Sequence, residues 1–189
     1  MRRFVLTGTP GSGKTTLLEE LAQRGFEVVR EAATEVIGRR QAAGEPAPWE
    51  RGDFVDEVAA LQRTLALTPA PAPAERSADP VRFHDRSPVC TEALRIFLGR
   101  PASPVLTAEL ERIGAEAVYR REVFFVRGLG FVERTAARRI SPADALAFER
   151  LHEQVYRACG YRLIEVPAAP VPERADLVEE AVRRIAAEC

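Results

Sequence analysis

Short apolar segments alternate with longer amphipathic segments along nearly the whole chain. The short segments predict buried strands at residues 4–6, 26–30, 81–85, 122–128 and 161–167. Between them, apolar residues recur at helical spacing and are bounded by Ser-Pro starts and glycine stops. These patterns predict helices at residues 14–25, 31–44, 49–67, 87–99, 103–117, 141–160 and 171–189.

Strands that alternate with helices form a parallel sheet covered by helices on both faces. We therefore expect a three-layer α/β/α fold, with ligands bound at the carboxyl ends of the strands. Residues 68–80, "TPAPAPAERSADP", break the pattern with a Pro- and Ala-rich loop of polyproline character. This loop is too short to separate two domains, so we expect a single domain over residues 1–189.

Composition and charge narrow the classes of function. The chain has 189 residues and a formal net charge of −1, so no global field favours nucleic acid or an anionic membrane. Cys90, Cys159 and Cys189 are odd in number and far apart, which fits a reducing cytosol rather than a disulfide framework or a zinc site. The apolar run "FVLTG" is too short for a signal peptide or a membrane span. We expect a soluble, cytoplasmic protein, and the sequence is compatible with a homodimer.

A glycine-rich loop follows the first predicted strand. The stretch "GTPGSGKT" from Gly8 to Thr15 fits G-x-x-x-x-G-K-[ST], and Lys14 is the only lysine among 27 Lys and Arg residues. A compact ammonium suits a polyphosphate better than the broad fork of Arg, which explains why one lysine persists here. The motif predicts binding of ATP or GTP with Mg²⁺, which Thr15 would ligate. The candidate nucleotide-binding residues are Gly8, Thr9, Pro10, Gly11, Ser12, Gly13, Lys14, Thr15 and Thr16.

Charged residues also follow the second and third predicted strands. Asp85 could hold the hydration shell of Mg²⁺, and Arg86 beside it could bind phosphate through two donors. The alternative is that both residues only cap the next helix. Glu31 could accept or orient the proton of an acceptor hydroxyl, or it could be a first-turn acid favoured by the helix dipole.

An Arg-rich turn, "ERTAARRIS", precedes the helix predicted at 141–160. Arg138 and Arg139 are candidates for cationic groups that close on a transferring phosphoryl, and Arg134 is a candidate nucleotide ligand. We therefore expect a small lid at residues 130–141, with a solvated basic loop as the alternative.

Four other residues have weaker signals. Trp49 either lines an acceptor pocket or packs at the start of the predicted helix 49–67. Arg127 contacts either phosphate or solvent. His84 and His152 are interpreted as packing residues, with no partners assigned to His152.

These motifs together resemble the AAA-type ATP/GTP-binding domain of small bacterial predicted ATPases, from about Phe4 to Arg174. That domain is similar to nucleoside and nucleotide kinases, which implies a five-stranded parallel sheet in the order 2-3-1-4-5. The "DRS" at residues 85–87 is similar to the Asp/Glu-Arg motif of deoxyribonucleoside and thymidylate kinases. The resemblance implies that Lys14, Thr15 and Asp85 bind ATP·Mg, and that Arg86 holds the acceptor or the transferred phosphate. It also implies that the Arg138/Arg139 turn is the lid.

Two functions remain open at this point. The first is a kinase that transfers the γ-phosphoryl group of ATP to a hydroxyl of a small molecule, either nucleoside-like or a natural product. The second is a nucleotide-dependent regulatory ATPase that acts through a protein partner. A switch GTPase is excluded because its N-K-x-D motif needs a second lysine, and a polynucleotide kinase is disfavoured by the near-neutral charge.

Overall fold

The computed structural model describes residues 1–8, 11–69, 80–128 and 142–187. The Arg-rich turn at 130–141 and most of the Pro- and Ala-rich loop at 68–80 lie outside the described residues. None of the described helices has the length and apolar character needed to cross a bilayer.

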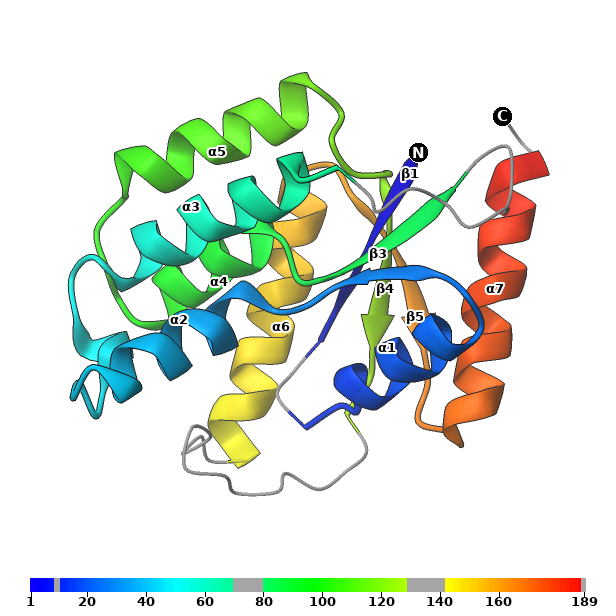
Figure 1. The fold of residues 1–189 in the computed structure, drawn as a ribbon, viewed down its shortest axis with the longest axis horizontal. Helices are drawn as coiled ribbons and strands as arrows, with labels where there is room; N and C mark the ends of the chain where they lie inside the picture. Colours follow the sequence, from blue (N-terminus) through cyan, green and yellow to red (C-terminus); the bar gives the residue numbers. More distant parts are fainter. Residues whose placement is uncertain (9–10, 70–79, 129–141, 188–189) are drawn as a thin grey trace.

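The centre of the molecule is a parallel sheet in which β1 lies between β3 and β4 (Figure 1). Its order is β2-β3-β1-β4-β5, which confirms the order implied by the resemblance. In register, Leu6 pairs with Asp85 and Thr7 pairs with Phe125, so the carboxyl ends of the three central strands reach the same edge. The strands are β1 (Arg2–Thr7), β2 (Glu27–Val29), β3 (Val81–Asp85), β4 (Glu122–Val126) and β5 (Arg162–Val166).

Helices follow each described strand, as the sequence pattern predicts. They are α1 (Lys14–Gln23), α2 (Ala32–Ala42), α3 (Phe54–Leu67), α4 (Pro88–Phe97), α5 (Pro104–Ala115), α6 (Pro142–Ala158) and α7 (Val171–Ala187). The predicted start of the third helix at Trp49 is wrong. Trp49 lies in a separate 3₁₀ turn, η1 (Pro48–Glu50), and α3 begins only after the N-cap residue Asp53.

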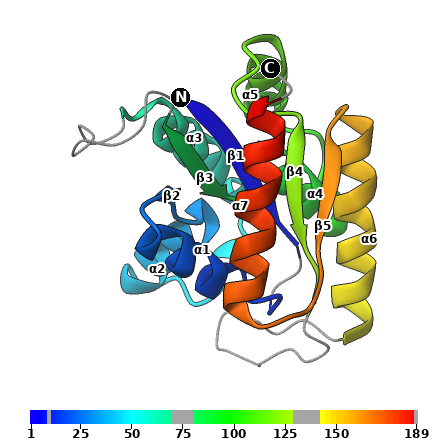
Figure 2. The ribbon, with the colours of Figure 1, turned by 90° about the vertical axis from the view of Figure 1, so that its right-hand side faces the viewer.

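The sheet separates two apolar layers because successive strand residues point to opposite faces. Phe4 and Leu6 pack with Phe83 and Phe124 beneath α1 and α7, whereas Val5 packs on the opposite face with α4 and α6. Figures 1 and 2 show α1 and α7 on one side of the sheet and α4 and α6 on the other. The arrangement is the expected three-layer α/β/α fold, and it places the loops after β1, β2 and β3 at one edge.

Candidate active site at the carboxyl edge of the sheet

The loop between β1 and α1 turns sharply because its glycines adopt backbone angles that other residues avoid. Gly8 has φ 137° and Gly13 has φ 75°, both in the region that favours glycine. A Cβ at Gly8 would lie 2.2 Å from the carbonyl oxygen of Val126 at the end of β4. Two features therefore exclude a side chain at residue 8: the nearby backbone of β4 and the positive φ angle.

Lys14 lies at the start of α1 and folds back over this loop. Its side chain is 7% exposed, and Nζ donates to the Gly8 carbonyl at 3.2 Å and to Ser12 Oγ at 3.3 Å. Burial and, after it, the nearby Arg86 charge lower the pKa of Lys14 to about 8, against the opposing effect of the Asp85 and Glu31 carboxylates. An anion bound in the loop would favour the charged ammonium and raise this pKa.

Glu31 and Arg86 meet at the ends of β2 and β3. Arg86 Nε lies 2.5 Å from Glu31 Oε1, and the Thr34 hydroxyl donates to Glu31 Oε2 at 2.7 Å. Arg86 also has φ 71°, rare for a residue with a side chain, and its N–H donates to the Leu6 carbonyl at 2.9 Å. Such a conformation persists only where surrounding contacts enforce it, which is common at functional sites.

The charges of this edge are strongly coupled. Burial alone would raise the pKa of Glu31, but the Arg86 and Lys14 charges and two hydrogen bonds hold it below its ordinary value. Burial opposes the charge of Arg86, yet Glu31 keeps the Arg86 pKa above its ordinary value. Glu31 is therefore an ionised acceptor and Arg86 a cationic donor at neutral pH.

His152 reaches the same edge from α6. Its ring is fully buried, Nδ1 lies 2.9 Å from the Phe148 carbonyl oxygen, and Nε2 lies 3.2 Å from Arg86 Nη1. Burial and the Arg86 charge lower the pKa of His152 to about 3. His152 is buried as the packing interpretation expects, but the expectation that it has no partners is wrong. One sequence signal could have indicated these partners: His152 is a polar residue on the apolar side of a helix that also carries Phe148, Val155 and Tyr156.

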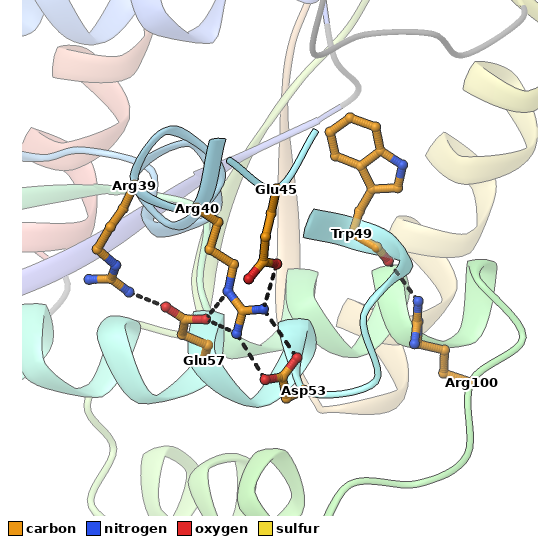
Figure 3. A network of polar contacts seen from close by, with 7 residues as sticks. All are labelled: Arg39, Arg40, Glu45, Trp49, Asp53, Glu57 and Arg100. Atoms are coloured by element: carbon orange, nitrogen blue, oxygen red, sulfur yellow. Dashed lines mark hydrogen bonds and ion pairs between the residues drawn. The ribbon is translucent and has the colours of Figure 1, made fainter. Parts of the chain in front are cut away.

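An ion-pair network fixes α2, the helix that begins after Glu31, against α3. Arg40 Nε donates to Glu57 at 2.5 Å, and Arg40 Nη2 donates to Asp53 at 3.0 Å (Figure 3). Trp49 is partly buried against the α2–α3 apolar cluster, and its carbonyl accepts from Arg100 at 2.6 Å. Packing between two helices accounts for Trp49 without a ligand.

Comparison with known proteins identifies the family. The family model described as "AAA domain" matches residues 3–174, which is most of the chain. The chain belongs to this AAA domain family. A search of curated proteins found no match.

Solved structures similar to this AAA domain include deoxyadenosine kinase from M. mycoides. With dCTP bound, that kinase is 13% identical, with TM-score 0.59 over 97% of this chain and 100% of the kinase. With dCMP and a flexible dCDP bound, it is 14% identical, with TM-score 0.57 over 97% of this chain and 99% of the kinase. Likeness at this identity shows the fold alone, which is that of P-loop kinases.

A further residue of the AAA domain was missed by sequence reasoning. Arg174 on α7 is 1% exposed, and its Nη2 donates to the Ser12 carbonyl at 2.8 Å. Burial lowers its pKa below the ordinary value for arginine. No sequence motif marks Arg174, because its contact with the loop depends on how α7 packs against α1.

The remaining predicted residues have different outcomes. Arg127 forms ion pairs with Glu149, Glu153 and Glu165 at 2.5–2.9 Å. Its partners in the structure are therefore these carboxylates, which neither of the two sequence-based alternatives, phosphate or solvent, included. His84 is buried with its ring edge-on to Tyr119 at 5.1 Å, as a packing residue should be. Thr15 and Thr16 are exposed in the first turn of α1. Thr9, Pro10, Arg134, Arg138 and Arg139 lie outside the described residues, so their predicted roles stay predictions.

The donors near the loop fit a magnesium ion. Mg²⁺ prefers oxygen ligands and usually takes one or two protein groups plus phosphate oxygens and water. Thr15 offers a hydroxyl at the start of α1, and Asp85 offers a carboxylate at the end of β3, beside β1. Both side chains are hard oxygen donors at the edge where the loop would bind a polyphosphate.

Proposed function

We propose that this protein is a small-molecule kinase that transfers the γ-phosphoryl group of ATP·Mg to a hydroxyl group. The observation that carries the proposal is the meeting of Glu31, Arg86 and Lys14 at one edge of the sheet. Glu31 forms an ion pair with Arg86 at 2.5 Å, and both charges affect the pKa of Lys14. A carboxylate at this edge can orient an acceptor hydroxyl, whereas in a hydrolytic NTPase it would orient water, so the test below distinguishes the two by the fate of the phosphoryl group.

In this proposal, different residues of the site bind the phosphates, the magnesium ion and the acceptor hydroxyl. Backbone N–H groups of the glycine-rich loop and Lys14 hold the β- and γ-phosphates, and Thr15 and Asp85 would hold Mg²⁺, which neutralises phosphate charge when bound. The acceptor hydroxyl oxygen forms a bond to the γ-phosphorus as the bond to the bridging oxygen breaks, and ADP leaves. The hydroxyl proton passes to Glu31 or to the transferred phosphoryl group.

Glu31 is suited to orient the hydroxyl more than to act as a strong base. Its lowered pKa keeps it ionised, and each carboxylate oxygen has more than one acceptor site beside the bonds to Arg86 and Thr34. In a loose transition state little negative charge builds on the attacking oxygen, so a weak base suffices. The nucleotides bound by the deoxyadenosine kinases support a nucleoside-like acceptor.

A single-turnover reaction tests the proposal. ATP labelled on the γ-phosphate is mixed with Mg²⁺ and a panel of nucleosides, nucleotides, sugars and hydroxylated metabolites. Label transferred to one compound supports the kinase and identifies the acceptor. Free phosphate without a labelled compound favours the regulatory ATPase.

The variant Glu31→Gln should retain its affinity for ATP·Mg and lose about 100-fold or more in transfer rate, the usual scale for a lost acid–base group. Glu111→Gln is the matched control, since Glu111 is an exposed acid on α5, away from this edge. Unchanged transfer by Glu31→Gln would exclude the role assigned to Glu31.

A further inference from the structure

His152 is held rigidly beside the Asp85–Arg86 segment by the packing of α6 on α4. Four residues beyond His152, the Tyr156 hydroxyl lies 2.8 Å from Ser87 Oγ and 3.0 Å from Cys90 Sγ. His152 itself lies edge-on to the Phe148 ring at 4.2 Å. The imidazole therefore has little freedom to turn, and its two nitrogens meet fixed partners.

Those partners determine the tautomer of His152. The Phe148 carbonyl can only accept a hydrogen bond, so Nδ1 must carry the proton. The Arg86 guanidinium can only donate, so Nε2 must offer its lone pair. One neutral tautomer satisfies both contacts, and the protonated ring would satisfy only the first.

The contact fixes the plane of the Arg86 guanidinium. Glu31 forms an ion pair with Arg86 at Nε, 2.5 Å away, and His152 Nε2 lies 3.2 Å from Nη1, so two side chains contact different nitrogens of one rigid planar group. A third contact, from the Arg86 N–H to the Leu6 carbonyl, fixes the backbone. The directions of the remaining guanidinium N–H groups follow from these constraints.

A neutral partner differs from a second carboxylate in its effect on charge. Glu31 already gives Arg86 one full negative charge. A second anion would orient the guanidinium equally well but would repel an incoming phosphoryl group. An imidazole orients Arg86 and leaves its charge available.

We propose that His152 is a positioning residue, whose neutral imidazole directs the Arg86 guanidinium toward an anionic group of the nucleotide or acceptor without neutralising it. The proposal rests on the proposed function in so far as Arg86 contacts phosphate during transfer. It concerns a residue of α6 that belongs to none of the sequence motifs.

Two substitutions separate this role from packing. The amide of Gln reaches about as far as Nε2 and can accept from Arg86, whereas the amide of Asn reaches only the position of Nδ1. We expect His152→Gln to keep most of the activity. His152→Asn should keep its ATP·Mg affinity but lose roughly 10- to 100-fold in kcat, the scale of a misplaced catalytic group. Thermal unfolding of both variants identifies any loss that only reflects stability.

A double-mutant cycle tests whether the loss acts through Arg86. In an Arg86→Lys background no guanidinium plane remains to be set, so His152→Asn should have little further effect. If His152→Asn lowers kcat by the same factor in both backgrounds, the proposal is overturned. Equal losses in His152→Asn and His152→Gln, matched by equal losses of stability, would also overturn it.

A measurement without catalysis keeps the proposal separate from the proposed function. The chain has two histidines, so ¹⁵N spectra of the imidazoles resolve His152 by comparison with His152→Asn. We expect the Nδ1-protonated tautomer at neutral pH. The Nε2 signal should shift when Arg86→Met is combined with Glu31→Gln, a pair that avoids leaving the Glu31 carboxylate without Arg86, and should shift less in Glu31→Gln alone.

The outcomes are distinguishable. An Nε2 signal unaffected by loss of the guanidinium overturns the role of His152, whatever the protein catalyses. The expected shift together with free phosphate and no labelled acceptor would support the contact of His152 with Arg86 and favour the regulatory ATPase over the kinase. In that case Mg²⁺-dependent hydrolysis of ATP replaces transfer as the kinetic readout for the same variants.

Discussion

Arg174 offers a test of how the glycine-rich loop is held in shape. This arginine is almost fully buried on α7, and its Nη2 donates to the Ser12 carbonyl at 2.8 Å. Ser12 is itself fully buried and lies two residues before Lys14. The perturbation is Arg174→Met, which keeps a long apolar side chain and removes both the charge and the donor.

The effect on affinity follows from the energy of that bond. A hydrogen bond from a charged donor contributes about 1.5–3 kcal/mol. If it maintains the loop conformation that binds phosphate, its loss should raise the Kd for ATP·Mg roughly 10- to 100-fold. The free energy of unfolding should change by about 1 kcal/mol or less, because replacing a buried charge with an apolar group removes its desolvation cost as well as its bond.

Isothermal titration of ATP·Mg and urea unfolding measure the two quantities. Arg24→Met is the matched control: Arg24, the C-cap residue of α1, also binds α7, through Asp176 at 2.6 Å and Glu179 at 2.8 Å. The control should bind ATP·Mg as the wild type does. If Arg174→Met also binds with wild-type Kd, Arg174 does not maintain the loop and the reasoning is refuted.

Two other predictions concern the loop. Since burial lowers the pKa of Lys14 to about 8, the affinity for ATP·Mg should fall as the pH rises through that value. The contribution of Lys14 to the free energy of unfolding should instead rise between about pH 8 and 10.5, where the unfolded chain binds the extra proton, and a Lys14→Met control should lack both trends. Gly8→Ala should cost roughly 2–5 kcal/mol, from overpacking and backbone strain, because its Cβ would meet the Val126 carbonyl. Gly38→Ala, in α2 with nothing near its Cβ, should instead stabilise the protein by about 0.5–1 kcal/mol in urea unfolding.

The sequence predicted most of the fold because strands and helices have different apolar periods. The order of strands came from resemblance, since periodicity does not say which strand lies beside which. The start of α3 was misplaced at Trp49, although Trp49 lies five residues before Phe54, which is not the three- or four-residue spacing of an apolar helix face. Pro48 instead begins a 3₁₀ turn, and α3 begins at Phe54.

The candidate site was predictable only where strand ends determine it. Glu31, Asp85 and Arg86 follow neighbouring strands of a parallel sheet, so their proximity follows from topology. His152 and Arg174 lie within helices, and the side of the helix that reaches the site depends on packing. Polar residues on apolar helical stripes are the signal to look for in such cases.

Charges of both signs gather at the described site. Lys14 and Arg174 are buried cations and Arg86 is partly buried, Glu31 and Asp85 supply carboxylates at this edge, and His152 adds no charge. The lowered pKa of Lys14 shows that its burial is not fully compensated. A bound polyphosphate would compensate it, so nucleotide binding and folding should be linked. At a ligand concentration 100 times the Kd, that linkage raises the free energy of unfolding by about 2.7 kcal/mol. The burial that lowers the Lys14 pKa is a cost of folding, and it leaves this edge preorganised for an anion.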